Sequence, residues 1–116
     1  MTKRQLIQRA AAIAVMAIGT FAAAAQSPTA KSTDEAAIRQ IVHTMESGWN
    51  SHDGVMFSSP FAADADYVIV NGDHVSGKPA IEEGHTALFT GIYKESRNKA
   101  NVKSIRFIRP DVAIAH

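Results

Sequence analysis

A stripe of apolar residues at helical spacing is the feature that most constrains the fold of this chain. Its members recur every three or four positions, which places them on one face of an α-helix. The pattern predicts an amphipathic helix that ends near Asn50. The stripe consists of Ile38, Ile41, Val42, Met45 and Trp49.

The start of this helix is predicted from a capping box over Ser32-Thr33-Asp34-Glu35. In that motif the Ser32 hydroxyl accepts from the amide of Glu35, while the Glu35 side chain reaches back. Asp34 and Glu35 would also lie favourably at the positive end of the helix dipole. We therefore expect residues 26–32 to form a short polar linker ahead of the domain.

Turn-forming residues divide the segment that follows. Gly54 and the Ser58-Ser59-Pro60 cluster predict a short helix around Val55 to Phe57. Residues 66–71 predict a strand, and the continuous apolar run from Tyr67 to Val70 is typical of a strand with both faces covered. Asn71-Gly72-Asp73 indicates a hairpin turn, and residues 74–76 would return as a second strand.

A second amphipathic helix is expected from Pro79 to about Thr90, because proline suits a first helical turn and Gly91 can end the helix. Its apolar face carries one histidine. Residues 102–108 then predict a strand, Arg109-Pro110-Asp111 a turn, and residues 112–116 another strand. The apolar face of the helix that begins at Pro79 consists of Ile81, His85, Leu88 and Phe89.

The first 25 residues are typical of a cleaved signal peptide, with a basic start, an apolar run and Ala23-Ala24-Ala25 before the expected cleavage site. The alternative is a membrane anchor, but the apolar run is shorter than the roughly 20 residues that a spanning helix needs. We expect a periplasmic or secreted protein that has no contact with the membrane after cleavage.

Charge and cysteine content exclude several partners and site types. The full chain has 12 basic and 11 acidic residues; the leader removes three basic ones, so the mature charge is −2. A mildly acidic chain without a basic run argues against nucleic acid as a partner. The absence of cysteine excludes disulfides and thiolate metal sites.

The order of these elements, together with several short motifs, resembles the nuclear-transport-factor-2-like superfamily with its SnoaL-like members, and most closely the SgcJ/EcaC family. The resemblance covers about residues 33–116. The motifs that carry it are Trp49-Asn50, Phe61-Ala62-Ala63-Asp64-Ala65-Asp66, Gly84-His85-Thr86-Ala87-Leu88-Phe89 and Arg106-Phe107-Ile108-Arg109-Pro110-Asp111-Val112-Ala113.

The resemblance implies an α+β fold in which a curved antiparallel sheet wraps around helices to form a cone with an apolar pocket. Such a fold has two further long strands beyond residue 116, so the SnoaL-like domain over residues 33–116 is expected to be incomplete at its C-terminus. Without them the last strand presents an open edge, which invites pairing. Truncation and completion by a partner chain are the two explanations.

His85 is the candidate catalytic residue, because its spacing from Ile81 and Phe89 places it on the apolar helix face. Burial would lower its pKa and keep the ring neutral, available as a base or hydrogen-bond partner. The alternative is a structural histidine whose ring is bonded to a backbone carbonyl. No second catalytic group lies at a fixed spacing from it.

Four aromatic residues are candidates for ligand binding: Trp49, Tyr67, Phe89 and Tyr93. The indole N–H of Trp49 is a possible donor. Asp64 and Asp66 would point to one side of an extended segment, but without a third ligand they predict a solvated turn rather than a metal site. His43 and the pairs at residues 52–53 and 73–74 are interpreted as surface. We expect no cofactor and no metal.

One departure from the ketosteroid isomerases matters. Their catalytic aspartate falls at about Ile69 here, and isoleucine cannot abstract a proton, so that mechanism does not carry over. Three hypotheses remain: a small-molecule enzyme that uses His85, a non-catalytic ligand-binding or dimerisation module, and an inactive fragment. The expected partners are a small apolar molecule and a second copy of the chain in a homodimer.

Overall fold

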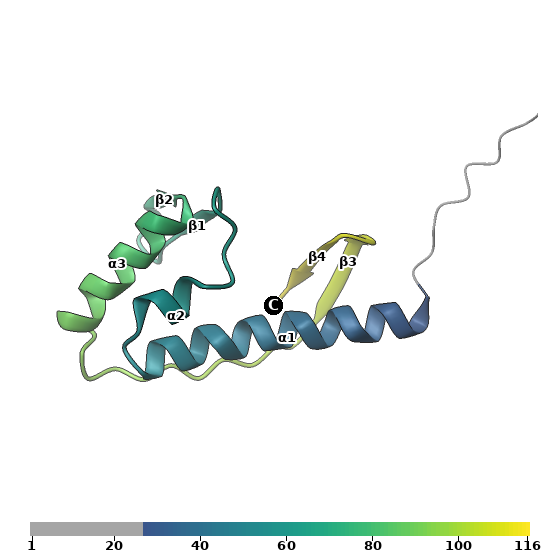
Figure 1. Ribbon diagram of the computed structural model, residues 1–116, viewed down its shortest axis with the longest axis horizontal. Helices are drawn as coiled ribbons and strands as arrows, with labels where there is room; N and C mark the ends of the chain where they lie inside the picture. The colour runs from purple at the N-terminus through teal and green to yellow at the C-terminus, as the bar shows by residue number, and fades with distance from the viewer. Residues whose placement is uncertain (1–26) are drawn as a thin grey trace, which may run out of the picture.

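The computed structural model describes residues 27–116, so the predicted signal peptide lies outside the described residues. Helices and strands follow one another in the predicted order (Figure 1). They are α1 (Pro28–Asn50), α2 (Gly54–Ser58), β1 (Asp66–Val68), β2 (His74–Ser76), α3 (Lys78–Thr90), β3 (Ile105–Arg109) and β4 (Val112–Ala115).

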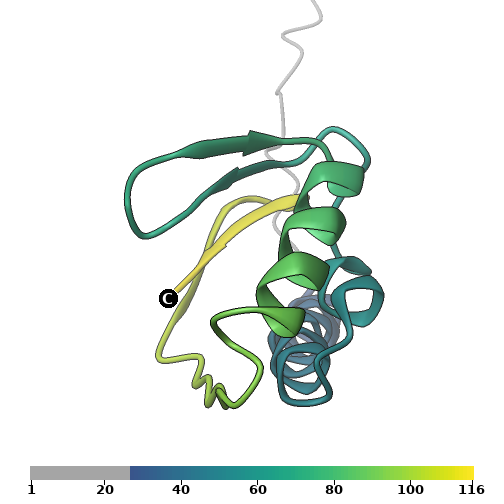
Figure 2. The ribbon, with the colours of Figure 1, turned by 90° about the vertical axis from the view of Figure 1, so that its left-hand side faces the viewer.

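The long helix α1 is the element around which the others are arranged (Figure 1). Helix α2 lies over the C-terminal end of α1, α3 packs on α2, and the β3–β4 hairpin lies beside the middle of α1 (Figure 1). An end-on view shows both hairpins on the same side of the helices (Figure 2). In the described residues, the strands form two antiparallel two-stranded sheets, β1–β2 and β3–β4. The predicted α+β class is confirmed.

The start of α1 differs from the prediction. The helix begins at Pro28, with Ser27 as its N-cap residue, so residues 28–32 are helical and not an extended linker. Proline is favourable at the first helical position because its φ is already fixed and its missing N–H has no helical partner. Ser32 lies inside the helix and donates its hydroxyl to the Thr29 carbonyl, 2.8 Å away. The predicted capping box is therefore wrong, whereas the end at Asn50 is confirmed.

Strand β1 is shorter and less covered than predicted. It ends at Val68, whose side chain is 67% exposed, and Val70 is fully exposed. Tyr67 and Ile69 are the partly buried positions, so only one face of the strand meets the helices. The predicted turn is confirmed: Gly72 adopts φ +91°, a conformation that favours glycine, and the Ile69 amide donates to the Asp73 carbonyl.

The hydrophobic core lies where α2 and α3 meet the C-terminal end of α1. Phe57 from α2 and Ile81 and Phe89 from α3 are its buried members. Because α3 faces this core, its predicted apolar face is confirmed. The partly buried residues that pack around the three are Met45, Trp49, Phe61, Ala65, Tyr67 and Val75.

Two glycines allow these helices to approach closely. A methyl group at Gly48 of α1 would overlap the backbone nitrogen and Cα of Phe57. A methyl group at Gly54 of α2 would overlap the Thr86 hydroxyl and lie 2.8 Å from the Thr86 backbone nitrogen. The absence of a side chain at these two positions therefore sets the spacing between α1, α2 and α3.

Polar side chains of α1 hold the extended segment 96–102 against the helix. Asn50 makes two reciprocal bonds with Asn98: its amide donates to the Asn98 carbonyl at 2.9 Å, and its oxygen accepts from the Asn98 N–H at 2.7 Å. Glu46 accepts from the Ala100 N–H at 2.9 Å, and Arg39 donates to the Val102 carbonyl at 3.1 Å. These bonds satisfy backbone groups of a segment that has no strand partner.

Replacing Gly48 with alanine is expected to destabilise the protein by about 1–3 kcal/mol, because the added methyl group meets backbone atoms that cannot rotate away. Gly84→Ala is the matched control, since a methyl group there has open space around it. That control should stabilise α3 by about 0.5–1 kcal/mol. Urea unfolding followed by circular dichroism measures both, and equal effects would contradict the close approach.

Replacing Asn50 with alanine removes both bonds to Asn98 and leaves partly buried backbone groups unpaired. We expect a loss of about 1–3 kcal/mol in unfolding free energy. Gln40→Ala is the control, because Gln40 lies on the exposed face of α1 and makes only a 3.5 Å contact with Thr44. A loss of unfolding free energy in Gln40→Ala as large as that in Asn50→Ala would show that the two bonds between Asn50 and Asn98 contribute nothing specific.

Candidate functional site

His85 lies at the centre of an aromatic cluster. It is 4% exposed and stacks on Phe57 with ring centroids 3.9 Å apart and planes 23° apart. Tyr67 and Trp49 present their rings edge-on at 5.3 and 6.1 Å. Residues from three helices and β1 therefore fix the imidazole in one orientation.

Hydrogen bonding determines which ring nitrogen of His85 carries the proton. Nδ1 lies 2.7 Å from the Ile81 carbonyl oxygen. A carbonyl can only accept, so Nδ1 must be protonated and donate. Burial lowers the pKa of His85, an effect that the bond to Ile81 partly opposes. At neutral pH the ring is therefore uncharged, and Nε2 is an acceptor.

Nε2 faces the hydroxyl oxygen of Tyr67 at 3.4 Å. Burial raises the pKa of the Tyr67 phenol, so the hydroxyl keeps its proton and can donate to Nε2. The distance is longer than the roughly 2.7–2.8 Å of a typical hydroxyl hydrogen bond. The pair is thus a neutral donor and a neutral acceptor held close together without a tight bond.

Two hollows adjoin this pair. The first, the hairpin hollow, lies between β1–β2 and α3 and has a volume of about 180 Å³. Apart from Tyr67 and His85, its lining residues are apolar. They are Tyr67, Ile69, Val75, Ala80, Ile81, Gly84, His85 and Leu88.

The second, the tryptophan hollow, has a similar volume of about 180 Å³. It shares Tyr67, Ile69, His85 and Leu88 with the hairpin hollow, so the Tyr67–His85 pair contributes to both walls. Its lining residues are Trp49, Tyr67, Val68, Ile69, Val70, His85, Leu88 and Tyr93.

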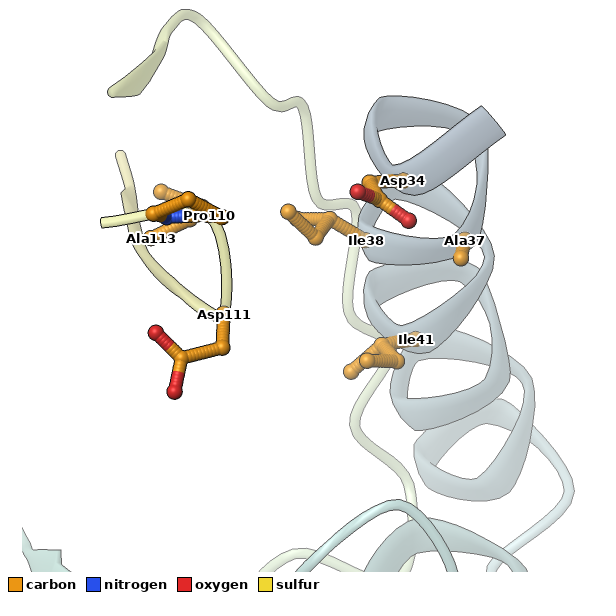
Figure 3. A pocket seen from close by; sticks show the side chains of 8 residues that line it. Asp34, Ala37, Ile38, Ile41, Pro110, Asp111 and Ala113 are labelled. Carbon is orange, nitrogen blue, oxygen red and sulfur yellow. The ribbon is translucent and has the colours of Figure 1, made fainter. Parts of the chain in front are cut away.

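A larger cavity of about 440 Å³ lies elsewhere, between α1 and the β3–β4 hairpin. Ile38 and Ile41 project from α1 toward Pro110 and Ala113 across the gap (Figure 3). Its polar lining side chains are the carboxylates of Asp34 and Asp111, and Asp111 accepts from Arg109 at 3.2 Å. It offers no neutral donor–acceptor pair, so the hollows at His85 are the stronger candidate site.

The structure places three of the four predicted ligand-binding residues at a hollow and the fourth in the hydrophobic core. Trp49 and Tyr67 line a hollow, as does Tyr93, which is 37% exposed and packs edge-on against Trp49 at 5.6 Å. Phe89 is buried in the core and lines neither hollow. The Trp49 N–H already donates to the Ser96 hydroxyl at 2.9 Å, so it is not free to bind a ligand.

The predicted surface carboxylates do not converge. Asp64 is exposed, and Asp66 binds His74 across the β1–β2 hairpin at 2.8 Å. Asp53 caps α2 by accepting from the Met56 N–H at 2.9 Å. Within residues 27–116, no group of three histidine or carboxylate side chains is close enough to hold a metal ion.

His52 corrects one prediction. It was expected at the surface, but its Nε2 is shielded from solvent and has no hydrogen-bond partner among the described residues. The ring meets Phe89 edge-on at 5.7 Å. The chain reverses here with His52 at φ 57°, which brings the ring against Phe89 instead of into solvent. His43, in contrast, is exposed as predicted.

Several lining residues were not identified as site residues from the sequence. Gly84 and Leu88 were recognisable in principle, because they lie one residue before and three residues after His85 on the same helix. Ala80 and Val75 carry no such signal. Neither does Ser96, which lines neither hollow but accepts from the Trp49 N–H, 47 residues away in the sequence. Their roles depend on how the hairpin and the 91–104 segment fold back.

Comparison with models of known protein families and with curated proteins finds no match. A solved structure is similar: a domain of unknown function with a cystatin-like fold from Nostoc punctiforme, with 31% sequence identity and a TM-score of 0.70. The match covers 72% of this chain and 51% of that one, so the chain spans about half the length of that domain. Among the described residues, no helix is both long and apolar enough to cross a membrane. The α+β fold of the chain is cystatin-like, in agreement with the predicted nuclear-transport-factor-2-like arrangement.

The stability of the protein should decrease with acidification through His85. Its pKa is lowered in the folded state, so below the unfolded value of about 6.5 the unfolded chain binds more protons than the folded one. The stabilisation is complete above that value and declines as pH falls toward the lowered folded pKa, by at most about 1.4 kcal/mol per pH unit.

Urea midpoints between about pH 7.5 and pH 5, a range that brackets the unfolded histidine pKa, would measure this decline. His85→Phe keeps a ring against Phe57 and should flatten the profile, whereas His43→Gln, at an exposed position of α1, should not. An unchanged profile in His85→Phe would assign the acid sensitivity to other groups.

Proposed function

We propose that this chain is a small-molecule-binding domain whose ligand is uncharged and mostly apolar, and that the ligand occupies the hairpin hollow beside Tyr67 and His85. The observation that carries this proposal is the placement of a neutral donor–acceptor pair in an otherwise apolar wall. Ligand sites commonly combine apolar lining with a few convergent polar groups that fix orientation.

The electrostatics of the pair favour an uncharged ligand. Burial lowers the pKa of His85 and raises that of Tyr67, so neither carries charge near neutral pH. A charged ligand would lose hydration without gaining an ion pair, which is unfavourable in an apolar site. An apolar ligand gains about 25 cal/mol for each square ångström of surface that it buries.

The volume limits the size of the ligand. At about 180 Å³ the hairpin hollow is smaller than the roughly 300–1,000 Å³ of typical drug-sized sites. It therefore fits one or two fused rings. A longer molecule would extend past Tyr67 and His85 into the tryptophan hollow, which shares four lining residues with it.

Proton-transfer catalysis is the second candidate function. A neutral His85 with an unprotonated Nε2 can accept a proton, and general bases of this kind act next to carbonyl groups. The lowered pKa makes it a weak base, and Ile69 occupies the position where a carboxylate would be required for the isomerase reaction. We therefore favour binding, with His85 acting as an acceptor.

Several further predictions accompany this proposal without being tested by it. These are export after cleavage of residues 1–25, membership of the SgcJ/EcaC family, the assignment of residues 33–116 to a SnoaL-like domain, and assembly as a homodimer. The similar domain from Nostoc punctiforme has no known function that could transfer.

Filling the hairpin hollow provides the test. Gly84 lines it, and a side chain there has open space, so Gly84→Leu should occupy the hollow without disturbing the fold. Ala87→Leu adds a branched side chain to an exposed position of the same helix and is the control. Calorimetric titration with the bicyclic alcohol 2-decalol should show binding to the wild type and to Ala87→Leu.

Gly84→Leu should weaken that binding by at least about tenfold, since the ligand loses most of its apolar contacts. Unfolding curves of both variants would verify that they fold equally well. Binding that is equal in Gly84→Leu and Ala87→Leu, or absent from the wild type, would contradict the proposal.

A further inference from the structure

We infer that the ligand of this site carries a hydroxyl group, and that the Tyr67–His85 pair discriminates against the corresponding ketone or ether. The inference rests on the proposed function and deepens it by naming the chemical class of the ligand. It follows from which atoms donate and which accept in two successive contacts, the one between His85 Nδ1 and the Ile81 carbonyl and the one between His85 Nε2 and the Tyr67 hydroxyl.

The direction is fixed at the Ile81 end. The carbonyl oxygen of Ile81 accepts from His85 Nδ1 at 2.7 Å, so Nδ1 carries the ring proton. Burial lowers the pKa of His85 and disfavours a second proton on Nε2. Nε2 therefore presents a lone pair toward Tyr67, and that lone pair needs a donor because the ring is only 4% exposed.

Two arrangements can satisfy this lone pair. In the first, the Tyr67 hydroxyl donates to Nε2 across 3.4 Å. Its only proton is then committed, and its oxygen offers lone pairs to the hollow. A ligand meets this oxygen favourably only if the ligand donates an O–H or N–H.

In the second arrangement, the ligand oxygen lies to one side of the two atoms and bonds to both. Because the atoms are 3.4 Å apart, an oxygen beside them can be at ordinary hydrogen-bond distance, roughly 2.8 Å, from each. That oxygen would accept from Tyr67 and donate to Nε2. Only a hydroxyl can do both, so both arrangements accept an alcohol or a phenol.

A ketone or an ether fits neither arrangement. It can accept from Tyr67 only by drawing the hydroxyl proton away from Nε2, which leaves a buried acceptor unpaired. The remaining side chains that line the hairpin hollow are apolar and cannot replace the missing donor. An unpaired buried group of this kind weakens binding by about tenfold or more.

A matched set of bicyclic probes tests the inference. 2-Decalol, 2-decalone and 2-methoxydecalin share one ring system and differ at one oxygen. Calorimetric titration of the wild-type protein should show 2-decalol binding at least about tenfold more tightly than the ketone or the ether. Equal affinities, or tighter binding of the ketone, would overturn the inference while leaving the proposed function intact.

Variants of His85 provide a second test of the inference with the same three probes. His85→Phe retains a ring against Phe57, and His85→Leu is a smaller apolar replacement in case the first does not fold. Either change releases the Tyr67 hydroxyl to donate to a ligand, so the preference for the alcohol should disappear or reverse toward the ketone. Retention of the full preference would show that His85 does not set it. Failure of all three probes to bind the wild type would refute the proposed function itself, and this inference with it.

Discussion

The contact between Gly48 of α1 and the backbone of Phe57 in α2 sets the geometry on which the candidate site depends. Because no side chain separates them, α2 lies close enough to α1 to direct the Phe57 ring into the core. That ring forms the surface on which His85 stacks at 3.9 Å. Gly54 repeats the arrangement on the other side of α2, against Thr86 of α3. The position of the imidazole is therefore a consequence of helix spacing, which two glycines determine.

The polar bonds of α1 have a complementary effect at the other wall of the site. By holding residues 96–102 along the helix, Asn50 and Glu46 keep Ser96 next to Trp49. The Trp49 N–H is satisfied there, and the indole ring is oriented toward Tyr93 and the tryptophan hollow. An aromatic wall near the candidate site is thus fixed by hydrogen bonds that lie outside it.

The sequence predicted what depends on local pattern. Helical spacing identified the buried face of α3 with His85, and turn residues located the β1–β2 hairpin. It did not predict contacts between distant residues, such as Trp49 with Ser96, because periodicity carries no information about them. It also failed where two local signals competed: helix α1 begins at Pro28, four residues before the predicted capping box at Ser32. The apolar run up to Val70 suggested a longer, fully covered strand, but Val68 and Val70 are exposed because the helices cover only one face of β1.

The choice between a structural and a functional histidine, which the sequence left open, changes once the two nitrogens are considered separately. Nδ1 has a structural role, because its bond to Ile81 satisfies a buried group and fixes the tautomer. Nε2 lies on the opposite side of the ring, next to Tyr67 and the hollows. The structural bond is what makes Nε2 an acceptor and not a donor. A histidine that is buried for stability thereby presents a defined acceptor toward the hollows. A structural role of Nδ1 is thus compatible with the proposed ligand-binding role of Nε2, because the first fixes the polarity that the second requires.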